Sequence, residues 1–155
     1  MPKIDIEQVP ESVGTTYPAP YDVPCLQRHK RHLSNAAGLT QFGVVLVTLP
    51  PGAWSAQRHW HTHEDEFVWV LSGELVLSTE DGREALRAGE CAGFKGGVAN
   101  GHHLVNESDT DAQFLVVGSR MDEDGAEYPD ADLRALPGRY SGKAGYTTKA
   151  GERLK

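Results

Sequence analysis

Short apolar segments separated by turn-forming residues recur along the middle of the chain. Residues 42–49 are apolar on both faces, which is typical of a strand enclosed between two layers. Further strands are predicted at 54–61, 66–71, 74–79, 83–87, 91–94, 102–106 and 112–118. Asp81-Gly82 predicts a two-residue hairpin turn, and no segment shows the period of an amphipathic helix. The pattern therefore predicts an all-β protein, either a sandwich or a barrel.

The two ends of the chain differ from this middle part. Residues 1–37 carry five prolines, which exclude a continuous helix and favour an extended arm that can contain a short strand. Residues 120–155 are sparse in aliphatic side chains and too polar to form a second domain. We expect an N-terminal arm over 1–37, a barrel over 38–119, and a tail over 120–155 that lies on the barrel by a few anchors or is partly mobile.

Composition limits the possible partners. The chain has 155 residues, the length of one domain, and a net charge of −7 that argues against nucleic-acid or membrane-surface binding. The N-terminus lacks the apolar run of a signal peptide, and no window predicts a membrane span. Cys25 and Cys91 have no CxxC spacing and fit a reduced, cytoplasmic compartment, with each thiol buried as a small apolar group.

The one basic run reads Arg28-His-Lys-Arg-His32. We interpret it as a solvated connecting segment, with an anion or phosphate site as the alternative.

A second feature, the pattern of histidines, predicts a metal-binding site. His59 and His61 are two positions apart, so on a strand they point to the same side, about 7 Å apart, and can reach one metal ion. Glu66 follows just beyond a tight turn, and His102 is supplied by a distant strand. Three imidazoles and one carboxylate suit Mn, Fe, Co, Ni or Zn.

Neighbouring polar residues are expected to lie outside this ligand set. His63 falls in the turn before Glu66 and is predicted to be exposed or to support the ligands, while Glu64 remains an alternative to Glu66 if the register shifts. Glu64 and Asp65 are expected to lie in water. His103 should face the opposite side from its neighbour.

Two stretches resemble the paired motifs of the cupin superfamily. The first is Gly52, His59-x-His61, Glu66 and Gly73, and the second is Gly89, Gly97, His102 and Asn106. The resemblance spans residues 38–119 and implies a double-stranded β-helix, also called a jelly-roll barrel. It also implies one divalent transition metal ion (Zn, Fe, Mn or Ni) on the ligands His59, His61, Glu66 and His102.

Three departures from the cupin motifs concern the loops. Gly52 is one residue further from His59 than usual, and two extra residues separate Gly97 from His102. Lys95 replaces a proline, which indicates either a looser loop or a cation near the barrel mouth.

The function that these features favour is a metal-dependent enzyme acting on a small molecule. The resemblance implies an isomerase or a dioxygenase, with the ion as Lewis acid or oxygen-binding centre. The alternatives are a non-catalytic module that binds or senses a small ligand, and a protein with a structural metal. The residues expected to face inward include no evident second general base, so the catalytic residues stay unassigned.

Aromatic residues alternate with the predicted ligands. If the ligands face inward, four aromatic residues form a patch outside the sheet: Trp54, Trp60, Phe67 and Trp69. A patch of this size requires a cover. We predict a homodimer, with covering by the arm and tail of the same chain as the alternative.

Overall fold

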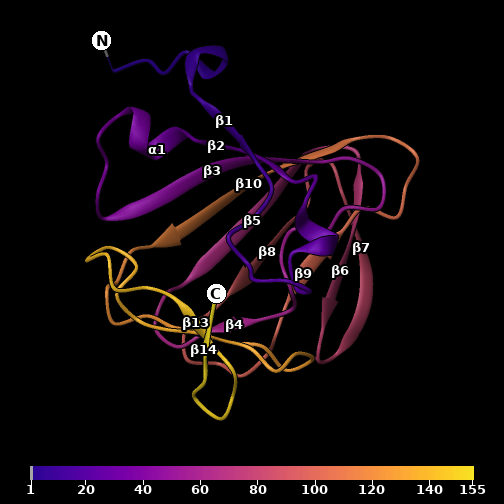
Figure 1. The fold of residues 1–155 in the computed structure, drawn as a ribbon. Helices are drawn as coiled ribbons and strands as arrows, with labels where there is room; N and C mark the ends of the chain where they lie inside the picture. The colour runs from indigo at the N-terminus through magenta and orange to yellow at the C-terminus, as the bar shows by residue number, and fades with distance from the viewer. Residues whose placement is uncertain (1) are drawn as a thin grey trace.

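The computed structural model describes residues 2–155, which fold almost entirely into antiparallel strands (Figure 1). Its helices are single short turns: η1 (Ile6–Gln8), η2 (Val23–Cys25) and α1 (Leu33–Ala36). The predictions of an all-β fold and of no continuous helix in the arm are confirmed. Within residues 2–155, none of the helices has the length and apolar character needed to cross a membrane.

The largest sheet has six strands and joins the N-terminal arm to the barrel. Its order is β1 (Glu11–Val13), β2 (His29–His32), β3 (Phe42–Leu49), β10 (Ala112–Ser119), β5 (Glu66–Ser72) and β8 (Cys91–Phe94). The basic run therefore forms a strand, and its interpretation as a connecting segment is wrong. Four antiparallel residue pairs join β2 to β3.

Two smaller sheets complete the fold (Figure 1). One has the order β7 (Gly82–Arg87), β6 (Glu74–Thr79) and β9 (His103–Val105). The other has the order β14 (Arg153–Leu154), β13 (Tyr146–Thr147), β12 (Arg134–Ala135), β11 (Ala126–Glu127) and β4 (Trp60–His61). The tail is thus hydrogen-bonded to the strand that carries His61, with Ala126 opposite His61.

The core lies between the six-stranded and three-stranded sheets. Strand β5 shows the alternation that produces it, because Val68 and Val70 are buried while Phe67, Trp69 and Leu71 are exposed. The buried aliphatic and aromatic side chains from both sheets include Val47, Leu49, Leu75, Leu77, Leu86, Leu104 and Phe114. Glu66 precedes Val68 by two residues, so this alternation points it to the same inner face.

Two predicted details are wrong. Thr79 pairs with Gly82, so the hairpin loop consists of Glu80 and Asp81, and Gly82 begins the next strand with a φ of 124°. The segment 54–61 is not one strand. It makes isolated bridges at Trp54 and His59 before the two-residue strand β4, because its backbone turns between the sheets.

The predicted aromatic patch is also smaller than expected. Trp54 packs edge-on against His103 and is half-buried, and Trp60 is half-buried on β4, which belongs to a different sheet. Phe67 and Trp69 remain exposed on the outer face of β5. Cys91 lies opposite Trp69 on that sheet and is exposed, so the prediction of two buried thiols holds for Cys25 and is wrong for Cys91.

Candidate metal centre

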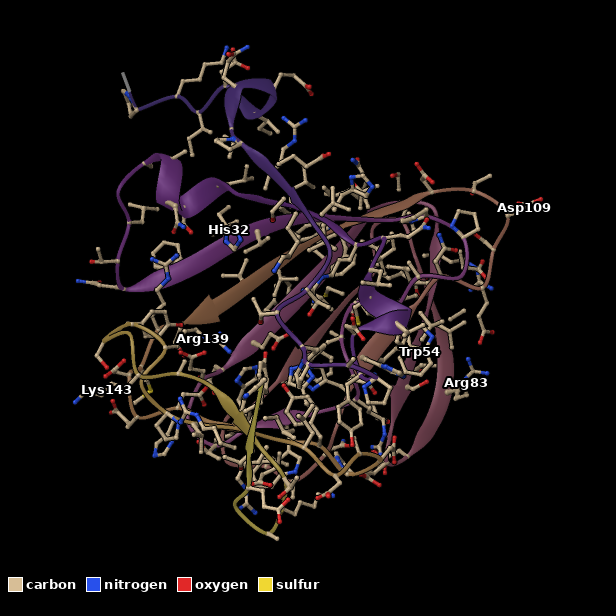
Figure 2. The ribbon with its side chains drawn as sticks, in the orientation of Figure 1. His32, Trp54, Arg83, Asp109, Arg139 and Lys143 are labelled. Carbon is tan, nitrogen blue, oxygen red and sulfur yellow. The ribbon has the colours of Figure 1, made fainter. Side chains whose placement is uncertain are left out.

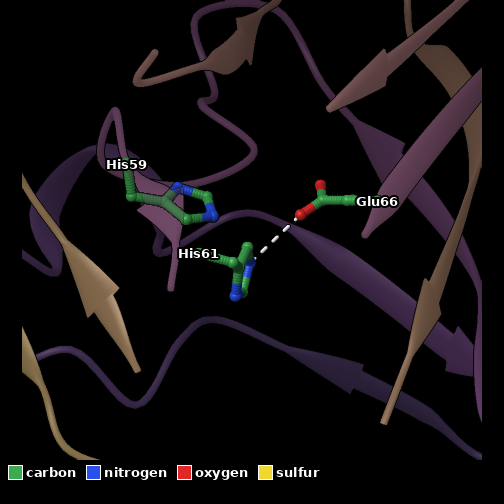
Figure 3. Close-up of side chains that lie close together, drawn as sticks. All are labelled: His59, His61 and Glu66. Atoms are coloured by element: carbon green, nitrogen blue, oxygen red, sulfur yellow. Dashed lines mark ion pairs between the residues drawn. The ribbon is translucent and has the colours of Figure 1, made fainter. Parts of the chain in front are cut away.

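Three of the four predicted ligands lie together on the inner wall of the barrel. The donor atoms of His59, His61 and Glu66 are all within 4.8 Å of one another (Figure 3). Nε2 of His61 is 3.1 Å from Oε2 of Glu66, and Nε2 of His102 is 3.3 Å from Oε1 of the same carboxylate. One glutamate therefore lies between imidazoles from two separate parts of the chain.

The ring of His59 is oriented by the backbone. Its Nδ1 donates a hydrogen bond to the carbonyl oxygen of Gln57 at 2.8 Å, which leaves the Nε2 lone pair free. Burial lowers the pKa of His59 to about 3, with the nearby His102 adding to the effect. A neutral imidazole with its proton on Nδ1 is the form that binds a metal through Nε2.

His61 is oriented by a carboxylate from the tail. Its Nδ1 donates to Oδ2 of Asp124 at 2.7 Å. Oδ1 of Asp124 accepts hydrogen bonds from the backbone amides of His63 and Glu64, so this aspartate also fixes the turn after β4. Burial acts to lower the pKa of His61, but the hydrogen bonds to Asp124 and Glu66 raise it to about 9.

His102 supplies the strongest sign that the cluster fits a cation. Its side chain is buried, and neither ring nitrogen is hydrogen-bonded. Its ring stacks face to face on Phe94, with centroids 3.6 Å apart, and lies 4.8 Å from the ring of His59. Because buried polar groups without partners are costly, a metal ion at this point would satisfy an otherwise unexplained imidazole.

Glu66 carries the negative charge of the cluster. Burial by itself would raise its pKa, but the imidazoles of His102 and His61, whose Nε2 atoms lie 3.3 and 3.1 Å from its oxygens, hold the pKa of this carboxyl well below its usual range. The glutamate is therefore ionised, as a metal ligand must be.

Glu64 is not in water, and that prediction is wrong. Its carboxylate is buried beneath the tail, where Oε2 accepts hydrogen bonds from the amide of Met121 at 2.9 Å and the hydroxyl of Tyr140 at 2.8 Å. A second grouping of possible ligand atoms consists of His61, Glu64 and Asp124. Both carboxylates already accept hydrogen bonds from the chain. Asp124 holds His61 and the turn, and Glu64 holds the tail through Met121 and Tyr140.

The other histidines behave largely as predicted. His63 is exposed, and its Nδ1 contacts the hydroxyl of Thr62 at 2.8 Å. His103 lies outside the cluster, where its Nδ1 donates to the carbonyl oxygen of Ala56 at 2.9 Å. It still lines the edge of the adjoining cavity. Asp65 is exposed, as expected, and accepts a hydrogen bond from the amide of Gly96.

The loop after β8 packs closely on the turn that follows His61. A side chain at Gly96 would place its Cβ 2.1 Å from the carbonyl oxygen of His63, so only glycine fits there. The amide of Gly97 donates to the carbonyl oxygen of His61 at 2.9 Å. Lys95 is exposed beside this contact and lines a separate side cavity of about 110 Å³.

The cluster opens onto a cavity of about 830 Å³ inside the barrel mouth. Its wall combines the inner face of the six-stranded sheet, including Val45 and Val116, with a group of tyrosines from the arm and the tail, namely Tyr17, Tyr128 and Tyr146. Tyr128 stacks on His59 with ring centroids 5.6 Å apart. A cavity of this size suits a small-molecule ligand.

Comparison with known proteins shows the family. The cupin domain profile matches residues 45–118. The structure superposes on that of a cupin-superfamily sugar phosphate isomerase from Silicibacter pomeroyi with a TM-score of 0.94 and 41% identity, covering 99% of this chain and 97% of that one. The chain belongs to the cupin superfamily. The predicted jelly-roll barrel is confirmed.

Other cupins show how far the likeness extends. A putative sugar phosphate isomerase from Acidithiobacillus ferrooxidans has a TM-score of 0.74 and 30% identity, covering 83% of this chain and 81% of that one. A predicted oxalate decarboxylase from Thermotoga maritima has a TM-score of 0.62 and 20% identity, covering 77% of this chain and 99% of that one, which supports the fold alone. A search of curated proteins gave no match.

Sequence reasoning missed the carboxylate that supports the cluster, Asp124 of the tail. It does predict tyrosine anchors in the tail, and two of them, Tyr128 and Tyr140, contact His59 and Glu64. The sequence contains several acidic residues near Asp124, and nothing in their spacing distinguishes the one that reaches His61.

Proposed function

We propose that this cupin is a metal-dependent isomerase of a phosphorylated sugar. The observation that carries the proposal is the position of the His59, His61 and Glu66 cluster on the wall of a cavity large enough for such a substrate. The 41% identity to a cupin-superfamily sugar phosphate isomerase over nearly the whole chain supports this reaction class.

We propose His59, His61, Glu66 and His102 as the ligands of one divalent ion, with Zn, Fe, Mn and Ni as candidates. All four are buried or half-buried, and the free nitrogens of His59 and His102 are available. When bound, such an ion supplies Lewis acidity, which polarises a carbonyl or hydroxyl group of an aldose or ketose.

The protein's own groups would bind and orient the substrate. Tyr17, Tyr128 and Tyr146 line the cavity on the side of the arm and tail. Burial, together with the neighbouring tyrosines, raises the pKa of Tyr128 well above its usual range, so this group remains a hydrogen-bond donor. Sugar hydroxyls need such neutral donors and acceptors.

Aliphatic residues would keep water from the reacting atoms. Val45, Val68, Val116 and Leu104 form an apolar wall beside the cluster. Because electrostatic interactions are stronger where water is excluded, this wall would strengthen the contacts that orient the substrate.

The proposal is tested on protein purified without a His-tag or added metal. Metal analysis should find one divalent ion per chain, and a panel of aldose and ketose phosphates should include one that the protein interconverts. His61→Ala should lose both the metal and the activity, whereas His63→Ala, which changes an exposed histidine outside the cluster, should retain both.

Two other results would contradict the proposal and indicate a different function. Substrate-dependent oxygen uptake with bound iron would indicate a dioxygenase. Tight binding of a sugar phosphate by the metal-loaded protein, with no conversion under any condition, would indicate a binding or sensing module.

A further inference from the structure

We infer that Lys30, supported by Arg28, forms an anion subsite that binds the phosphate group of the substrate at the end of the cavity away from the metal centre. The inference rests on the proposed function for the identity of the substrate, and on the charges in the cavity for the subsite itself.

The charges that line the cavity differ from those of the whole protein. The chain carries a net charge of −7, yet the cavity is lined by five basic side chains, namely Arg28, Lys30, Arg139, Arg153 and Lys155. The one acidic side chain in this lining is that of Glu66, which we propose as a metal ligand. A cationic cavity in an acidic protein selects anionic ligands.

Lys30 faces the interior because of its position in the sheet. It lies directly opposite Val47 on β3, and residues that pair in this way project to the same face. Val47 is buried in the barrel core. Lys30 therefore projects from the basic run into the cavity, while Arg31, its neighbour, turns outward and pairs with Glu11.

The ammonium of Lys30 has no negative partner within residues 2–155, since no carboxylate there lies within ion-pair distance. Burial, reinforced by the charges of Arg28 and Arg139, lowers the pKa of Lys30 to about 8. The amine is still mostly protonated at neutral pH. A phosphate group would supply the missing negative charge, because ammonium groups commonly bind phosphates through charge-assisted hydrogen bonds.

Arg28 is fixed beside Lys30 by the backbone. Its Nε donates to the carbonyl oxygen of Gly14 at 3.3 Å, and its Nη1 donates to that of Ser55. These neutral acceptors leave the guanidinium charge uncompensated, and the guanidinium has further N–H donors available for a phosphate oxygen.

The separation of Lys30 from the proposed metal centre suits a substrate that has a phosphate at one end and a carbonyl at the other. Lys30 and Glu66 lie on the same face of one sheet, on β2 and β5, with β3 and β10 between them. Three strand spacings correspond to about 14 Å across the sheet. The register aligns Lys30 with Val70, which is four residues from Glu66, so the two residues are also separated by about 13 Å along the strands. The long lysine side chain and the closure of the barrel bring the ammonium of Lys30 closer to Glu66 than these backbone spacings. A sugar chain with a phosphate at one end and a carbonyl at the other would extend between the two groups.

The test measures binding of inorganic phosphate by isothermal titration calorimetry, in metal-free and in metal-loaded protein. Lys30→Met should weaken phosphate binding about tenfold in both forms, since a charge-assisted hydrogen bond is lost. Lys30→Arg keeps the charge and should stay within a few-fold of the wild type. Lys143→Met removes an exposed lysine at the outer edge of the tail (Figure 2) and should change nothing.

Several outcomes would overturn the subsite. A Lys30→Met variant that binds phosphate with wild-type affinity would overturn it. A loss of phosphate affinity in Lys95→Met and not in Lys30→Met would also overturn it, because Lys95 lines the separate side cavity. Acetate binding as tightly as phosphate would overturn the phosphate assignment.

The two proposals fail separately. Phosphate binding is measured without turnover, so Lys30-dependent binding in a protein that isomerises no sugar phosphate would refute the reaction and keep the subsite. An isomerase whose KM for the sugar phosphate is unchanged by Lys30→Met would keep the reaction and refute the subsite.

Discussion

Nδ1 of His61 lies 2.7 Å from Oδ2 of Asp124, which is 63 residues further along the chain. This hydrogen bond connects a proposed metal ligand to the C-terminal tail, and it fixes which nitrogen of the imidazole faces the cluster. Carboxylates in this position raise the basicity of a metal-binding histidine and hold its ring in place.

Asp124→Asn should therefore weaken metal binding about 10–100-fold, because a neutral amide replaces the charged acceptor. The measurement is competition with a calibrated chelator. Glu123→Gln changes an adjacent exposed carboxylate and is the matched control. Equal metal affinity in both variants would show that Asp124 only shapes the turn.

His102→Ala should also lose stoichiometric metal, while His103→Ala should keep it. The two residues are adjacent and both buried, but His102 has unsatisfied ring nitrogens and His103 donates to Ala56. Metal content is measured after dialysis, with circular dichroism to check folding. Retention of a full equivalent by His102→Ala would remove this residue from the proposed ligand set.

Arg58 joins three separate segments next to the cluster. It binds Asp130 through two hydrogen bonds of 2.7 and 2.9 Å, Glu80 at 2.7 Å, and the carbonyl oxygen of Gly101 just before His102. Arg58→Lys cannot keep this arrangement and should lower the free energy of unfolding by about 1 kcal/mol, a few degrees in Tm.

Thermal unfolding would measure the effect. Arg83→Lys is the control, because Arg83 pairs with Glu107 at an exposed position where ion pairs contribute little. An Arg58→Lys variant that is no less stable than Arg83→Lys would contradict the prediction.

Lys30 should make stability depend on pH above neutrality. Its pKa is lowered to about 8 in the folded protein, from an ordinary value of 10.5. Between these two values the unfolded chain binds more protons than the folded one, so the free energy of unfolding should rise with pH across this window. Below about pH 8 the cost of burying the charged amine is present in full.

Urea unfolding in phosphate-free buffer at several pH values from 7.5 to about 10.5 would test this linkage. Lys30→Met should lack this component of the rise. A wild-type protein and a Lys30→Met variant with parallel pH profiles would show that the amine is well solvated.

The outer face of the six-stranded sheet remains a predicted dimer contact. Phe67, Trp69 and Leu71 are 37%, 49% and 46% exposed, and they lie side by side on β5. Such a patch favours association through a two-fold axis. Trp69→Glu should convert a dimer into a monomer in light scattering, whereas Leu26→Glu, at another exposed apolar position, should not. A monomeric wild type would refute the dimer.

The sequence determined the barrel and the cluster because both depend on local periodicity and on spacing. The alternation of strand residues located Val68 and Val70 in the core and Phe67 and Trp69 outside. The interval from His59 to Glu66 was sufficient to bring together three side chains that could hold a metal ion, since one short turn joins the two segments.

The distant residues that complete the site depend on contacts formed only in the folded chain. Asp124 reaches His61 because strand β11 pairs with β4, a contact between segments more than sixty residues apart that neither segment encodes by itself. Lys30 faces the cavity because β2 pairs with β3 in a register that aligns it with Val47. Local sequence specifies the face that a strand buries, whereas the pairing of strands far apart in the chain depends on the packing of the whole fold.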